Sequence, residues 1–162
     1  MSVKKAKTNR TSLNGLIMTA KIMLRAAAII IFLHNIGHTM AVFTWKNDSD
    51  PKKMEVIKQM TENKFPFMGT SRSMGEYFEG FGIHGILSLL LITMILWYVS
   101  DVRESNKNLN KKIILSVSVI LLVWGIIELV YFFPLAASFS LISSLLCFYS
   151  LLLVNKRLNV RA

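Results

Sequence analysis

The stretch IILSVSVILLVWGIIELVYF, residues 113–132, decides the fold of this chain. It holds one charged residue, Glu128, in a run that is otherwise apolar or weakly polar. An α-helix needs about 20 such residues to cross the hydrocarbon core of a bilayer. Lipid offers no hydrogen-bond partner to an unpaired backbone group, so a run of this kind must be helical there. The stretch therefore predicts a membrane-spanning helix.

Three further apolar runs have the same character and similar lengths. The chain of 162 residues is 53% hydrophobic with a mean hydropathy of +0.49, which is too apolar for an ordinary soluble domain. We therefore predict an all-α fold, a polytopic membrane four-helix bundle, with a single integral membrane domain over residues 1–162. The predicted spans are residues 23–45, 77–99, 113–132 and 135–154.

The net charge of +10 is explained by membrane topology. The basic residues flank the apolar runs and form no groove interleaved with aromatic residues, which argues against a nucleic-acid partner. Basic loops stay in the cytoplasm, so we predict a bacterial plasma-membrane protein with both termini cytoplasmic and with membrane lipid as its surroundings. The basic residues at the cytoplasmic side are Lys4, Lys5, Lys7, Arg10, Lys21, Arg25, Arg103, Lys107, Lys111, Lys112, Lys156, Arg157 and Arg161.

The first outer loop contains a stretch that is typical of a short helix. In SDPKKMEVIKQM, residues 49–60, either Ser49 or Asp50 can cap a helix that has Pro51 at its first position. Apolar residues then recur at helical spacing, which predicts an amphipathic helix lying on the outer surface. The apolar residues of this stripe are Met54, Ile57 and Met60, and Phe65 and Phe67 follow as predicted interfacial anchors.

The histidines and the one acidic residue well inside a span share the outer half of the bundle once the topology is set. At about 1.5 Å per residue, His38 and His84 each lie roughly two turns below the outer end of their span. His34 lies about one turn deeper than His38, and Glu128 about one turn below its outer end. Exposing imidazole or carboxylate to lipid is costly, so we expect these side chains to face the interior of the bundle.

Three kinds of chemistry suit such a group of histidines and a carboxylate. A divalent metal would take His38, His84 and Glu128 as ligands, and two histidines on facing helices could ligate a haem. Histidine and glutamate could also exchange protons with a quinone or another lipid-soluble substrate. The leading hypothesis is a cofactor or metal site for redox or proton-coupled chemistry on such a substrate, with His34 completing it. Residues at the rim of this site would be Arg72, Glu76 and Tyr77.

Two other classes of function stay open. The histidines can be structural hydrogen-bonding groups in a non-catalytic accessory protein that binds another membrane protein. A small transporter ranks third, because the chain shows no discontinuous helices. No Ser or Cys nucleophile is evident at the depth of the histidines, which disfavours a hydrolase. Packing is the simplest role of the small residues in the spans, which are Gly80, Gly82, Gly85, Ser138, Ser140, Ser143 and Ser144.

Two motifs also resemble those of a known group of proteins. HNIGHT in the first span and SRSMGEYFEGFGIHG at the start of the second resemble small bacterial four-helix membrane proteins, loosely of the DoxX type. The resemblance implies the four-helix architecture, draws attention to His38 and His84, and implies no particular activity. The matching positions are Gly37, His38, Arg72, Ser73, Tyr77 or Phe78, Gly80, Phe81, His84 and Gly85.

Overall fold

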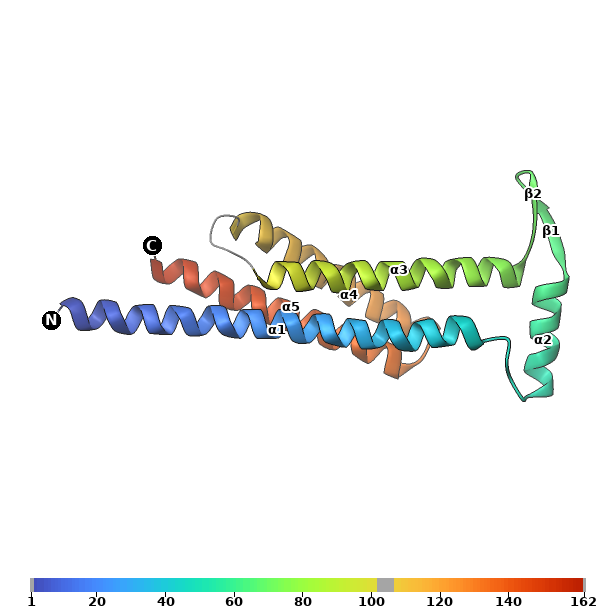
Figure 1. The fold of residues 1–162 in the computed structure, drawn as a ribbon, viewed down its shortest axis with the longest axis horizontal. Helices are drawn as coiled ribbons and strands as arrows, with labels where there is room; N and C mark the ends of the chain where they lie inside the picture. Colours follow the sequence, from blue (N-terminus) through green and yellow to red (C-terminus); the bar gives the residue numbers. More distant parts are fainter. Residues whose placement is uncertain (1, 102–106, 162) are drawn as a thin grey trace. The chain divides into compact units, whose positions relative to one another are not determined.

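A computed structural model describes residues 2–101 and 107–161 of the chain (Figure 1). Over these residues the protein has five helices and one two-stranded hairpin, which confirms the predicted all-α class. Four of the helices are long and apolar enough to cross a membrane, over Met18–Thr44, Met74–Ser100, Asn108–Tyr131 and Pro134–Asn155. By length and composition the chain is a multi-pass membrane protein.

The long helices extend beyond the predicted spans at several ends. Helix α1 covers Ser2–Thr44, α3 Met74–Ser100, α4 Lys107–Tyr131 and α5 Pro134–Arg161. The extension of α1 toward the N-terminus is reasonable because the basic segment contains no proline, and its single glycine, Gly15, only weakens a helix. The described residues do not include Arg103. They also do not include the side chains of the basic residues before Gly15, at position 107 and after Asn155.

The helices pack into two compact units, and the single membrane domain stays a prediction. The first unit consists of the chain up to His34 and from Leu91 onward, and so combines parts of α1 and α3 with α4 and α5. Its apolar core comes from all four helices: Leu24, Ala27, Ile31, Leu96, Leu121 and Cys147 are buried.

Buried serines of α5 hold the helices of the first unit together. The Ser143 hydroxyl donates to the Ala27 carbonyl of α1 at 3.3 Å, and that of Ser144 donates to the Ser118 carbonyl of α4 at 2.8 Å. Helices in lipid have no hydrophobic driving force for association, and hydrogen bonds between them contribute to it instead. The predicted packing role is confirmed for these two serines.

Helices α4 and α5 approach each other closely. A Cβ atom on Gly125 would lie 2.7 Å from the side chain of Leu141, so only glycine fits at this crossing. The connection between the two helices is short because α4 ends at Tyr131 and Pro134 begins α5, where proline costs no hydrogen bond. This tight turn places the last turn of α4 beside the first turns of α5.

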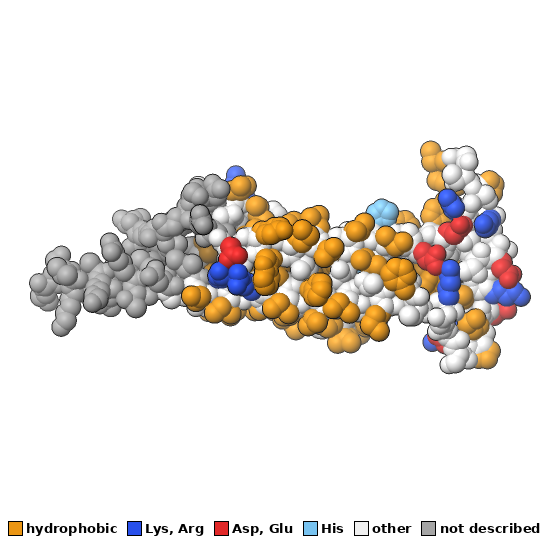
Figure 2. Space-filling view, viewed as in Figure 1, with side chains coloured by type: hydrophobic (Ala, Val, Ile, Leu, Met, Phe, Trp, Pro, Cys, Tyr) orange, Lys and Arg blue, Asp and Glu red, His pale blue; other side chains and the backbone are white. Residues whose placement is uncertain are grey.

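The second unit, Asn35–Leu90, contains the amphipathic helix that the sequence predicts. Helix α2 covers Pro51–Glu62, and the carboxylate of its N-cap, Asp50, accepts from the Lys52 amide at 2.9 Å. In Figure 1, α2 runs across the direction of the adjoining ends of α1 and α3, and Figure 2 shows charged side chains gathered over α2 and the hairpin. This orientation is the one expected of a helix on a membrane surface.

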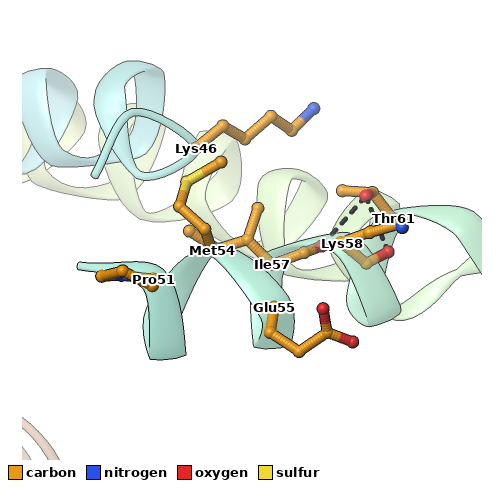
Figure 3. A pocket seen from close by; sticks show the side chains of 7 residues that line it. All are labelled: Lys46, Pro51, Met54, Glu55, Ile57, Lys58 and Thr61. Carbon is orange, nitrogen blue, oxygen red and sulfur yellow. Dashed lines mark hydrogen bonds between the residues drawn. The ribbon is translucent and has the colours of Figure 1, made fainter. Parts of the chain in front are cut away.

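An open groove of about 560 Å³ runs along α2 (Figure 3). Met54 and Ile57 line it opposite Lys46, and the Thr61 hydroxyl donates to the carbonyls of Ile57 and Lys58 at 2.9 and 3.1 Å. The hydroxyl of Thr61 is thus used within its own helix.

A β-hairpin follows α2, in a segment for which the sequence predicts no helix or strand. Strands β1 (Lys64–Phe67) and β2 (Thr70–Ser73) pair antiparallel, and Met68 and Gly69 form the turn with φ angles of 47° and 83°. Two positive φ angles define a type I′ turn, which normally has Asn-Gly or Asp-Gly. Met-Gly lacks that signal, and Pro66 disfavours a strand except at an edge. Phe65 and Phe67 are exposed on this hairpin.

Candidate functional site

The structure brings together two of the predicted site residues, His34 and Glu128. His34 lies on α1 and Glu128 on α4, one turn before the end of that helix. The His34 Nε2 atom lies 3.1 Å from Glu128 Oε1, and the two residues are only 6% and 5% exposed. A membrane-embedded histidine and carboxylate therefore form a close pair inside the first unit, and this pair is the candidate site.

The Glu128 carboxylate accepts hydrogen bonds from two side chains besides its ion-pair contact with His34. The Trp124 Nε1–H group, four residues earlier on α4, donates to Oε1 at 3.0 Å, and this is the oxygen that lies 3.1 Å from His34 Nε2. The Ser140 hydroxyl of α5 donates to Oε2 at 2.7 Å and is completely buried. Indole can only donate, so the contact with Trp124 fixes Oε1 as an acceptor.

The hydrogen-bond pattern also bears on the protons of His34. The Ser140 hydroxyl gives its one proton to Glu128, so it can only accept from the His34 Nδ1 atom that lies 3.5 Å away. Glu128 Oε1 lies 3.1 Å from Nε2. A proton on either ring nitrogen of His34 therefore has a polar oxygen nearby, at 3.1 Å from Nε2 and at 3.5 Å from Nδ1.

An aromatic ring holds the imidazole in position. The Phe139 ring, next to Ser140 on α5, stacks on His34 with centroids 5.6 Å apart and planes inclined by 20°. The ring of His34 is thus fixed by the stacking contact and by polar partners at both nitrogens. Such fixed geometry favours a group that exchanges a proton without a change of rotamer.

The other two histidines belong to the second unit and use backbone partners. The His38 Nε2 atom lies 3.1 Å from the Gly82 carbonyl oxygen of α3, and the His84 Nδ1 atom lies 2.8 Å from the Gly80 carbonyl of its own helix. His38 is half-buried and His84 is exposed. A carbonyl only accepts, so these nitrogens carry protons.

Glycines let α1 and α3 approach each other around His38. A Cβ atom on Gly85 would lie 2.6 Å from the His38 Nε2 atom, and one on Gly82 would lie 2.6 Å from the side chain of Val42. The packing role of these two glycines is therefore confirmed. A Cβ on Gly80 would meet nothing within 4 Å, so close packing does not explain this glycine in the described part of the chain.

The predicted metal site and haem site gain no support from the side-chain arrangement. Within residues 2–101 and 107–161, no group of three or more His, Cys, Asp or Glu side chains is placed to hold a metal ion. The assignment of His38, His84 and Glu128 as ligands stays a prediction, as does a single site that includes all three histidines.

The predicted rim residues form the start of α3. The Ser73 amide donates to Glu76 Oε2 at 2.7 Å while the Glu76 amide donates to the Ser73 hydroxyl at 3.2 Å. This is a capping box, and Arg72 Nη1 donates to Glu76 Oε1 at 3.2 Å. Tyr77, in the next position, is half-buried. Ser73 is thus the N-cap of α3.

Sequence reasoning missed two members of the site, Trp124 and Ser140. Trp124 carried a usable signal, because positions four apart on a helix are neighbours. Ser140 carried none, since its partners His34 and Glu128 lie on other helices.

Comparisons with protein-family models, with curated proteins and with solved structures find no match to this chain. The resemblance to DoxX-type proteins therefore stays a prediction. The fold and the site define a multi-pass membrane protein with a buried histidine–glutamate pair whose carboxylate accepts hydrogen bonds from Trp124 and Ser140.

Proposed function

We propose that the protein carries out proton-coupled chemistry in the membrane, with the His34–Glu128 pair as the site that holds the proton. The observation that carries this proposal is the set of contacts around His34, which gives a partner to a proton on each ring nitrogen. Ionisable side chains inside membrane spans are typical of proton relays.

The same contacts permit the loss of one proton. In this proposal His34 is an imidazolium and Glu128 a carboxylate. If the proton leaves His34 Nδ1, the contact of Nε2 with Glu128 and the hydrogen bonds from Ser140 and Trp124 are all kept. The pair then changes from neutral to singly negative, which is costly in a low-dielectric interior. Release of the proton is therefore easier when another event compensates the charge, and this preference couples proton release to a second process.

A proton suits the pair better than a metal ion. Both oxygens of Glu128 accept hydrogen bonds within the protein, and His34 Nε2 already lies 3.1 Å from one of them, so a metal would have to displace these partners. We further propose a lipid-soluble substrate, because the pair is buried among helices whose outer faces are apolar. The protein would lie in a bacterial plasma membrane with both termini in the cytoplasm, as the distribution of basic residues favours.

The fluorescence of Trp124 tests the proposal, because its indole donates directly to the carboxylate that pairs with His34. The signal of Trp124 is the difference between the emission of the full chain and that of Trp124→Phe. We expect this difference to change reversibly with pH and the change to disappear in His34→Gln and in Glu128→Gln.

A matched control is available in the second unit. There the Trp45 indole donates to Glu79 Oε1 at 3.3 Å, in the same combination of indole and carboxylate. Glu79→Gln should leave the pH response of Trp124 unchanged. A response that survives in both His34→Gln and Glu128→Gln would show that the pair does not hold the proton.

The second candidate is a non-catalytic accessory protein in which the pair only fixes helix packing. The buried hydrogen bonds from serines of α5 to neighbouring helices favour this role, because they join helices without any ionisable group. The double variant His34→Gln with Glu128→Gln separates the two. It keeps hydrogen-bonding groups and removes both charges, so an accessory protein would keep its stability and its partner, whereas a proton-coupled protein would lose activity.

A further inference from the structure

A cluster of charged side chains at one end of the first unit has an excess of positive charge. Lys21 and Arg25 of α1 both contact Asp101, the residue that follows α3. The Arg25 Nη2 atom lies 3.1 Å from each of the two carboxylate oxygens, and Lys21 Nζ contacts Oδ1. Two cations thus share one carboxylate, and the cluster carries a net charge of about +1.

Contacts with two neighbours, Trp97 and Ser100, fix the position of the Arg25 guanidinium. Its carbon lies 4.8 Å from the centroid of the Trp97 ring, and Nε donates to the Ser100 hydroxyl at 3.3 Å. Ser100 in turn donates to the Trp97 carbonyl at 2.6 Å. Nη1 of Arg25 forms no hydrogen bond with any residue that the structure describes, so its two N–H groups have no partner among those residues.

The cluster is accessible and lies at the boundary of the membrane. The side chains of Lys21, Arg25 and Asp101 are 35%, 36% and 49% exposed. Lys21 and Arg25 lie near the start of the apolar span Met18–Thr44, and Asp101 directly follows the span Met74–Ser100. This is the level at which lipid phosphates lie, with the apolar helix surfaces beside it.

We propose that this cluster binds the phosphate group of an anionic lipid. A guanidinium with two N–H groups that have no partner among the described residues matches the geometry of phosphate oxygens, and Lys21 adds a second cation. A singly negative lipid such as phosphatidylglycerol neutralises the excess charge, while its acyl chains lie along the apolar helices. Asp101 competes with the phosphate for the same two cations, so it sets the affinity of the site.

The test is native mass spectrometry of the full chain in detergent with equal amounts of phosphatidylglycerol and phosphatidylcholine. We expect preferential binding of phosphatidylglycerol and a loss of about fivefold in Arg25→Gln, which is what one basic residue contributes near a membrane surface. Asp101→Asn should instead strengthen the binding by about fivefold, because it removes the competing carboxylate.

Lys46 provides the matched control, because it pairs with Glu79 at 2.6 Å in a cluster of one cation and one carboxylate. Lys46→Gln removes the same charge and should leave the lipid preference unchanged. Weaker or unchanged phosphatidylglycerol binding in a folded Asp101→Asn protein would overturn the proposal. Inorganic phosphate, added alone as a second arm, should displace the lipid poorly, and equal binding of the two would refute the lipid assignment.

Discussion

The hydroxyl of Ser140 provides the sharpest quantitative test of the buried pair. Ser140→Ala removes the donor that lies 2.7 Å from Glu128 Oε2 and adds no new group. A hydrogen bond to a charged group contributes about 1.5–3 kcal/mol, whereas neutral bonds between membrane helices average about 0.6 kcal/mol. If Glu128 is ionised, the variant should therefore lose about 1.5 kcal/mol of unfolding free energy.

Ser150 is the matched control for this substitution. It is also completely buried on α5 and also bonds to a neighbouring helix, but its partner is the neutral Ala20 carbonyl of α1 at 3.4 Å. Ser150→Ala creates a cavity of the same size and should cost only about 0.5 kcal/mol. The difference between the two variants then reports the charge of Glu128 and not the loss of volume.

Reversible unfolding in mixed detergent and lipid, titrated with a denaturing detergent, measures both free energies. The expected difference of about 1 kcal/mol corresponds to about a fivefold change in the unfolding equilibrium. Equal losses in Ser140→Ala and Ser150→Ala would refute the reasoning, because they would show that Ser140 bonds to an uncharged partner.

Three further predictions concern other parts of the chain. Gly85→Ala should destabilise the protein by about 1–3 kcal/mol in the same unfolding assay, because the new Cβ would lie 2.6 Å from His38 Nε2. Gly80→Ala should be neutral or stabilising, because a Cβ at this position would meet no atom within 4 Å. Met68→Asn should slow amide hydrogen exchange in the hairpin by a factor that corresponds to about 0.5 kcal/mol, because asparagine tolerates the φ of 47° better than methionine; faster exchange would contradict this explanation. The hydrogen bond from Lys21, followed by that from Arg25, lowers the pKa of Asp101 below its ordinary value, so its stabilising effect is present above about pH 4 and is lost as the pH falls through the lowered pKa. Thermal unfolding should accordingly show Asp101→Asn less stable than the unaltered chain at neutral pH and equally stable in acid, and a difference that persists in acid would argue against the ion pair.

The membrane architecture could be predicted from the sequence because it depends on local properties. A run such as residues 113–132 must be helical in lipid whatever its neighbours are. The cap and proline before α2, Asp50 and Pro51, act within one turn, so their signal was equally clear. The hairpin was missed because its turn depends on Met68 in a conformation that methionine rarely adopts.

The candidate site could be predicted only in part. Depth along the helices indicated that His34 and Glu128 could meet, but depth alone does not tell which histidine faces which helix. In the structure His34 is the histidine that contacts Glu128, whereas His38 bonds to the Gly82 carbonyl. This selection depends on helix rotation and on close contacts such as Gly85 against His38, which no single segment of sequence specifies.

The protonation state of His34 is the most direct test of the central claim. Nuclear magnetic resonance of the chain with ¹⁵N-labelled histidine reports the protons on each ring nitrogen, and a His38→Gln, His84→Gln background leaves His34 as the single labelled residue. We predict protons on both Nδ1 and Nε2 at neutral pH, and the loss of the Nδ1 proton on substitution of Glu128 by Gln. A neutral ring in the unaltered site, with one nitrogen unprotonated, would contradict the assignment of the pair as the site that holds the proton.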